Sequence, residues 1–138
     1  FKDVKVENNF PWQRLHWKSL ETAYRTSPYF EYYEDDLARI FEKKYTYLLD
    51  VNLDTIETIL ACLFVHINFD KTKGYEAEPQ GVKDYRFLSS AKKEYPITMP
   101  PYHQIFSDKY GFIPNLSILD LLFHEGPNTQ EYLTKVIV

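Results

Sequence analysis

The block GFIPNLSILDLLFHEGP, at residues 111–127, constrains the fold more than any other part of the sequence. Pro114 prevents a helix from continuing backwards, Asn115 is a favourable helix N-cap, and the closing Gly-Pro pair ends the element. These signals predict a helix of two to three turns over residues 116–125. Because apolar side chains surround most of it, we expect this helix to be buried.

Three polar residues, Ser117, Asp120 and His124, interrupt this apolar block at spacings of i, i+3 and i+7. They share one stripe of the helix, but side chains at i and i+7 are separated by roughly 10 Å of helical rise. This spacing argues against a hydrolytic triad, in which the base lies within hydrogen-bonding reach of the nucleophile. A buried Asp120 must be paired or hydrogen-bonded. Either it ties the helix to another segment through Arg, His or backbone amides, or it lines a polar pocket.

The spacing of apolar residues predicts three more helices in the first half of the chain. They are expected over residues 11–27, over residues 28–44 with Ser27 as the N-cap, and within residues 45–65 with Asn52 as the N-cap. Residues 1–6 and 66–71 alternate as short strands do, and residues 71–101 form a long irregular loop. The final segment, QEYLTKVIV, fits either a helix or a strand. We therefore expect a mainly helical α+β fold, with one or two short strands, in a single domain over residues 1–138.

Composition narrows the class of protein. The net charge is −4, and no basic run exceeds two residues, which argues against nucleic-acid binding because phosphate backbones require clustered Lys and Arg. Cys62 is the one cysteine, so no intrachain disulfide can form, and its apolar neighbours predict a buried thiol in a reducing compartment. No apolar run approaches the ~20 residues that cross a bilayer. We expect a cytoplasmic protein without a membrane span.

Metal and cofactor motifs are missing from the sequence. It contains no CxxC, no HExxH and no glycine-rich phosphate loop, and it has four glycines in all. The acidic residues between Glu31 and Asp36 are expected to fan around a helix surface, whereas metal ligation needs convergent carboxylates. No metal site is predicted, and any cofactor is left unassigned.

The C-terminal block, together with PPYHQIF before it and KDYR and LHWKSLETAYRTSPYFEYYEDDL further back, resembles the WbqC-like family of bacterial proteins, in particular a branch common in Bacteroidetes. The matching positions are Tyr102, Gln104, Phe106, Phe112, Pro114, Asn115, Leu116, Ser117, Ile118, Asp120, Leu121, Leu122, Phe123, Gly126 and Pro127. Family members begin with a further segment, so the resemblance implies that this chain is the C-terminal part of the family domain. Members are encoded among genes for O-antigen and other surface polysaccharides, which implies a role in building or modifying glycans.

Two hypotheses follow. The first is an enzyme that transfers a group on a sugar nucleotide or another glycan precursor, with His16, His103 and Asp120 as catalytic candidates and Arg86 holding phosphate. Further candidates for ligand binding are Trp12, Trp17, Asp84, Tyr85, Gln104 and Asn115, because aromatic faces stack on sugars. The alternative is a non-catalytic binding or assembly module in the same pathway, whose polar residues hold the core together. The two hypotheses differ in whether His16, Arg86, His103 and Asp120 face one cleft.

Overall fold

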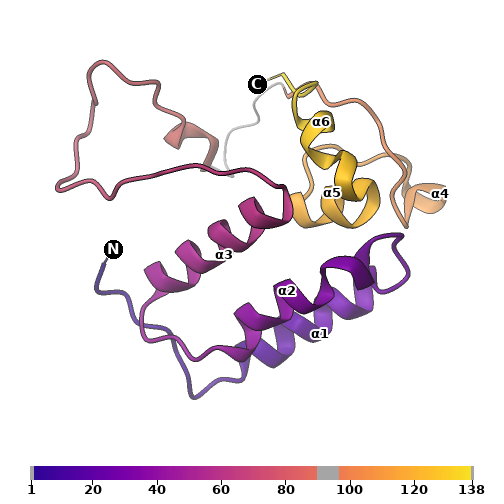
Figure 1. The fold of residues 1–138 in the computed structure, drawn as a ribbon, viewed down its shortest axis with the longest axis horizontal. Coiled ribbons are helices and arrows are strands. Elements are labelled where there is room, and N and C mark those ends of the chain that lie inside the picture. The colour runs from indigo at the N-terminus through magenta and orange to yellow at the C-terminus, as the bar shows by residue number, and fades with distance from the viewer. Residues whose placement is uncertain (1, 90–96, 138) are drawn as a thin grey trace.

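Helices account for the regular structure of this protein (Figure 1). The computed structural model describes residues 2–89 and 97–137. The helices are α1 (Trp12–Tyr24), α2 (Phe30–Glu42), α3 (Leu48–Cys62), α4 (Ser107–Tyr110), α5 (Ile118–Glu125) and α6 (Thr129–Leu133), with 3-10 turns at Arg86–Ser89 and Gly126–Asn128.

The expected α+β class is wrong, because the described residues contain no sheet. Strand-like pairing is limited there to two isolated antiparallel bridges, Lys5 with Tyr47 and Thr98 with Ile137. The strand expected at residues 66–71 is an exposed irregular segment, and residues 1–6 contribute one bridge. A strand needs neighbours that satisfy its backbone groups along its length. Residues 2–6 have two such bonds, from Val6 to Thr46 and from Leu48 to Val4, which is too few for a strand. The C-terminal segment divides into α6 and the bridge at Ile137.

The helices α1 and α2 lie side by side, and the turn between them differs from the expected one (Figure 1). The buried hydroxyl of Ser27 donates to the carbonyl of Tyr24 at 2.6 Å, so it does not cap α2. The second helix begins later, at Phe30. Just before it, the backbone N–H of Tyr29 donates to the carbonyl of Phe123 at 3.0 Å. This bond fixes the start of α2 against α5.

The third helix begins earlier than expected. It starts at Leu48, so Asn52, the expected N-cap, lies inside α3. The N–H of Leu48 donates to the carbonyl of Val4 at 2.9 Å, which ties the N-terminal segment to the start of the helix. Asp54 accepts hydrogen bonds from Tyr45 and Lys43, and these bonds anchor α3 to the end of α2.

The core forms where α2 meets α5 and the end of α3. Its fully buried members include Phe30 of α2 and Leu122 and Phe123 of α5, each 0% exposed. Cys62 is buried, as expected. The helix α5 is buried over most of its length, as the sequence predicts. None of the helices in the described residues is both long enough and apolar enough to cross a membrane.

Gly126 at the end of α5 is required by its surroundings. Its φ is +54°, and a Cβ built there would lie 2.6 Å from the ring of Tyr29. Gly111 also has a positive φ of +71°, but no atom lies within 4 Å of its would-be Cβ. Substitution of either glycine therefore strains the backbone, but only at Gly126 does the new side chain also clash with a neighbouring ring.

We predict that Gly126→Ala lowers the free energy of unfolding by at least about 3 kcal/mol, because the half-buried Tyr29 ring packs against the core and must move. Gly111→Ala, the matched control, should cost about 1–2 kcal/mol, from backbone strain alone. Urea denaturation measures both values. Equal losses for the two variants would contradict the close approach of Gly126 to Tyr29.

Candidate functional site

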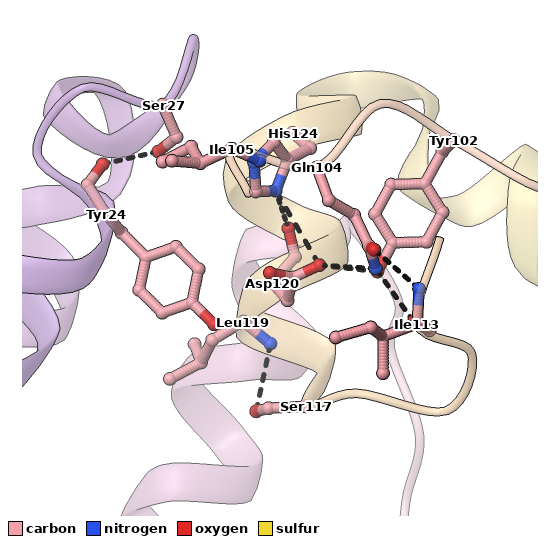
Figure 2. Close-up of polar contacts among 10 residues, drawn as sticks. All are labelled: Tyr24, Ser27, Tyr102, Gln104, Ile105, Ile113, Ser117, Leu119, Asp120 and His124. Carbon is pink, nitrogen blue, oxygen red and sulfur yellow. Dashed lines mark hydrogen bonds and ion pairs between the residues drawn. The ribbon is translucent and has the colours of Figure 1, made fainter. Parts of the chain in front are cut away.

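The polar stripe of α5 forms the best-defined polar site among the described residues, and Asp120 is its centre (Figure 2). The N-cap of α5 is Ser117, whose hydroxyl accepts the N–H of Leu119 at 3.3 Å. The expected cap, Asn115, lies outside the helix with a positive φ of 56°. Asp120 is therefore in the first turn, where the helix dipole favours a negative charge. It is 4% exposed.

Neutral donors satisfy the Asp120 carboxylate. The hydroxyl of Tyr102 donates to Oδ2 at 2.6 Å, and Nε2 of Gln104 donates to the same oxygen at 3.3 Å. Gln104 is buried and also exchanges two hydrogen bonds with the backbone of Ile113, each at 2.9 Å. Figure 2 shows these side chains converging on α5 from the segment that precedes it. The network clamps an irregular segment onto a helix.

His124 is buried one turn after Asp120, and both of its ring nitrogens are engaged. The backbone N–H of Ile105 donates to Nε2 at 3.0 Å. Nε2 is then an acceptor, which assigns the ring proton to Nδ1, 2.6 Å from the backbone carbonyl oxygen of Asp120. This pattern defines a neutral imidazole. The ring acts as a second clamp between α5 and the segment at residues 102–106.

Two tyrosines beside Asp120 are held in the protonated form. Burial, followed by the charge of Asp120, raises the pKa of Tyr24 to about 12. The pKa of Tyr102 is also raised, first by burial and then by its hydrogen bond to Asp120. Both phenols remain donors at neutral pH. A general acid or base works best with a pKa near the operating pH, so these tyrosines suit positioning rather than proton transfer.

The three catalytic candidates do not gather in one place. Asp120 is buried in its network, while His103 is exposed and its ring centroid lies 6.5 Å from that of His124. His16 is exposed on α1, with its ring 5.6 Å from that of Trp12. It precedes Tyr24, the α1 residue beside Asp120, by eight positions, or about 12 Å of helical rise.

Asp84, Tyr85 and Arg86 lie in the loop that extends away from the helices (Figure 1). The guanidinium of Arg86 donates to both carboxylate oxygens of Asp84, at 2.6–3.0 Å, and to the carbonyls of Glu76 and Ala77 at 2.8 and 2.9 Å. The hydrogen bond from Arg86 lowers the pKa of Asp84 to about 2. The side chain of Arg86 therefore holds residues 76–86 together by bonding within that loop. The neighbouring Tyr85 is 54% exposed.

The remaining ligand-binding candidates are held in three different settings. Trp12 and Trp17 are half-buried on α1, with ring centroids 6.5 and 5.5 Å from that of Phe41. Asn115 is exposed, and its backbone N–H lies 3.2 Å from the sulfur of Met99. Gln104, in contrast, contacts Asp120 directly. Of the predicted residues, the structure brings together Gln104 and Asp120, with His103 at their edge.

Sequence reasoning did not include Tyr24, Tyr102 or the backbone of Ile113 among the site residues. Tyr102 could have been identified from the sequence, because it is one of the positions that match the WbqC-like family and it directly precedes His103. Tyr24 lies 96 positions from Asp120, and no local pattern links the two. Among the described residues no group of three or more His, Cys, Asp or Glu side chains is arranged to hold a metal ion.

Comparison with known proteins gives one match. The model of a family described as the WbqC-like protein family matches residues 1–95 and 91–132. No curated protein matches the chain, and no solved structure matches it.

We predict that Tyr102→Phe lowers the free energy of unfolding by about 1–3 kcal/mol, because a buried carboxylate loses a hydrogen-bond donor. Tyr110→Phe is the matched control, since Tyr110 is 60% exposed, and its effect should stay within about 0.5 kcal/mol. Urea denaturation at neutral pH measures both. A Tyr102→Phe protein as stable as the control would contradict the network around Asp120.

Alkaline pH should weaken the fold. The unfolded chain releases phenolic protons near pH 10, whereas the pKa of Tyr24, Tyr33 and Tyr45 in the folded chain is raised to about 12. The contribution of these groups to stability is complete below about pH 10 and is lost as the pH rises towards about 12. Tyr24→Phe should reduce the slope of unfolding free energy against pH in this range, and Tyr110→Phe should leave it unchanged. An unchanged slope for Tyr24→Phe would contradict the prediction.

Proposed function

This chain belongs to the WbqC-like protein family, and we propose that it is a non-catalytic binding module for glycan precursors in surface-polysaccharide biosynthesis. The pathway is the one that the family resemblance implies. The absence of turnover is proposed from the geometry of the polar groups in the family block.

One observation carries this proposal: the buried polar side chains of α5, Asp120 and His124, are hydrogen-bonded within the protein. A catalytic base needs a lone pair within reach of the proton that it removes. Oδ2 of Asp120 accepts from Tyr102 and Gln104, and the residue is 4% exposed. Nε2 of His124 accepts a backbone N–H. A substrate would have to break these bonds before Oδ2 of Asp120 or Nε2 of His124 could act on it.

The supply of exposed aromatic rings supports the glycan part of the proposal. The sequence contains 12 Tyr and 10 Phe, and several of these rings face solvent, among them Tyr32 at 63%, Phe64 at 65% and Tyr75 at 85% exposed. Aromatic faces pair an apolar surface with a polar edge, which suits the mixed surface of a sugar ring.

Group transfer on a sugar-nucleotide precursor is the second candidate function, and His103 favours it. Its imidazole is exposed beside the ring of His124 and the Asp120 network. An exposed imidazole can contact a bound substrate directly, and histidine is the side chain that most often serves as a general acid or base. In this case, Asp120 and His124 would position the segment that carries His103.

The test uses the full-length protein with a panel of nucleotide sugars and neutral oligosaccharides. Isothermal titration calorimetry measures binding, and mass spectrometry of the same mixtures detects any transferred or hydrolysed product. We predict binding of at least one glycan ligand without turnover, and unchanged binding by His103→Ala. His66→Ala is the matched control, because His66 is exposed in the loop after α3.

Turnover that falls by about 100-fold or more in His103→Ala, the scale of a lost general acid or base, would reject the non-catalytic module and support the group-transfer enzyme. Binding of no member of the panel would reject the glycan-binding module.

A further inference from the structure

A groove between α2 and α3 lies apart from the Asp120 network. Its volume is about 500 Å³, within the roughly 300–1,000 Å³ of small-molecule sites. It is lined by Tyr32, Tyr33, Asp36, Arg39, Thr58, Ala61, Cys62 and Phe64. These residues include two exposed aromatic rings, three hydroxyl groups and one charge of each sign.

Tyr33 supplies a polar group that the protein itself does not satisfy. The side chain is 2% exposed, and its hydroxyl has no hydrogen-bond partner among the described residues. Buried hydroxyl groups in proteins nearly always have a partner. The oxygen is itself buried, so a ligand hydroxyl in the groove would supply this partner once the side chains around it move.

Phe64 occupies a backbone position that favours glycine. The carbonyls of Leu60 and Ala61 accept the N–H groups of Val65 and Phe64, at 2.9 and 3.0 Å, which is the hydrogen-bond pattern of a Schellman motif at the end of α3. The residue has a φ of 56°, where a bulky side chain is strained. Its ring is nevertheless 65% exposed, so burial in the core does not compensate for this strain. Such a local cost points to a role outside the fold.

Tyr32 brings a second ring to the groove. It is 63% exposed, and its ring meets that of Tyr33 edge to face, with centroids 4.7 Å apart and planes at 82°. This contact fixes the ring before any ligand binds. Asp36 and Arg39 add an exposed ion pair at 3.5 Å, in which Asp36 supplies hydrogen-bond acceptors and Arg39 supplies donors. The groove therefore combines preformed rings with donors and acceptors for hydroxyl groups.

Electrostatics argue against a phosphate in this groove. The cation that lines it, Arg39, is already paired with Asp36. The groove also adjoins the C-terminal end of α3, at Ala61 and Cys62, where the helix dipole disfavours an anion. Carbonyl groups at a helix end instead accept hydrogen bonds from neutral hydroxyl groups.

We propose that this groove binds the neutral sugar part of a glycan, with Tyr32 and Phe64 contacting the apolar face of a sugar ring and the Tyr33 hydroxyl bonding one of its hydroxyl groups. This inference rests on the proposed glycan-binding function. It assigns the contact to sugar units rather than to the diphosphate of a nucleotide sugar.

The experiment is an NMR titration of the ¹⁵N-labelled full-length protein. The probes are maltotriose, cellotriose, mannotriose and chitotriose, with UDP and inorganic pyrophosphate as anionic controls. We expect at least one trisaccharide to shift backbone signals of the groove residues at 32–39 and 58–64, and neither anion to do so.

Two variants separate binding from stability. Phe64→Gly relieves the positive φ and should raise the melting temperature by about 4 °C while weakening sugar binding about tenfold. Tyr33→Phe removes an unsatisfied hydroxyl, so it should keep or raise the melting temperature and also weaken binding about tenfold. Tyr110→Ala, an exposed tyrosine that does not line the groove, is the matched control and should bind as the unaltered protein does.

The outcomes distinguish the site from the function. Sugar binding that shifts signals only outside the groove, or that is unchanged in both groove variants, rejects the groove as the binding site. The proposal that the protein binds glycans is then retained. Shifts of the groove by UDP or pyrophosphate alone overturn the neutral-sugar assignment. No response to any glycan in the panel, here and by calorimetry, rejects both the groove and the module.

Discussion

A buried carboxylate that is stabilised by neutral donors organises the C-terminal part of this protein. Asp120 is on the helix whose neighbouring residues, Leu122 and Phe123, enter the core beside Phe30. The helix can lie there because Tyr102 and Gln104 hydrogen-bond the carboxylate. Without those donors, burying the charge would oppose the packing of α5. The apolar contacts and the polar network are therefore one structural unit.

The same network explains how an irregular segment is held in place. Residues 97–117 contain one short helix, yet this segment contacts α5 through defined bonds. The amide of Gln104 bonds the backbone of Ile113 in both directions, and the N–H of Ile105 bonds His124. A fully satisfied polar network in a low-dielectric interior specifies one arrangement of the chain. These bonds occupy Oδ2 of Asp120 and Nε2 of His124.

The sequence predicts which segments are helical better than it predicts where the helices begin. Apolar spacing identified α1, α2 and α3, because burial of one face requires that spacing, and the proline and Gly-Pro signals at its two ends identified α5. Three expected caps were wrong. Ser27 and Asn52 have suitable side chains, but contacts made elsewhere set the starts of α2 and α3. At α5, the hydroxyl of Ser117 forms the cap in place of Asn115. The bond from Tyr29 to Phe123 joins residues 94 positions apart, and no local pattern contains it.

The candidate site was predictable to a similar degree. A buried Asp120 had to have partners, and this expectation is confirmed. Their identity was not predictable, because Arg, His, Tyr, Gln and backbone amides can all serve, and the fold decides which is near. Tyr102 and Gln104 precede Asp120 by 18 and 16 residues, and they reach it because the chain between them folds back on itself. The relation of His16 and Arg86 to this site depended on the course of the whole chain.

Satisfied and unsatisfied polar groups both occur around the core, where Trp12, Tyr33 and Thr129 each have a buried polar side-chain atom without a partner among the described residues. Around α5, each side-chain nitrogen of His124 and Gln104 has a partner. Between α2 and α3, the Tyr33 hydroxyl has none among the described residues, and Phe64 adopts a strained backbone conformation. Local violations of folding rules tend to occur at functional sites, because selection for folding alone would remove them. The groove between α2 and α3 is lined by both kinds of feature, a buried hydroxyl without a partner at Tyr33 and a strained, exposed residue at Phe64.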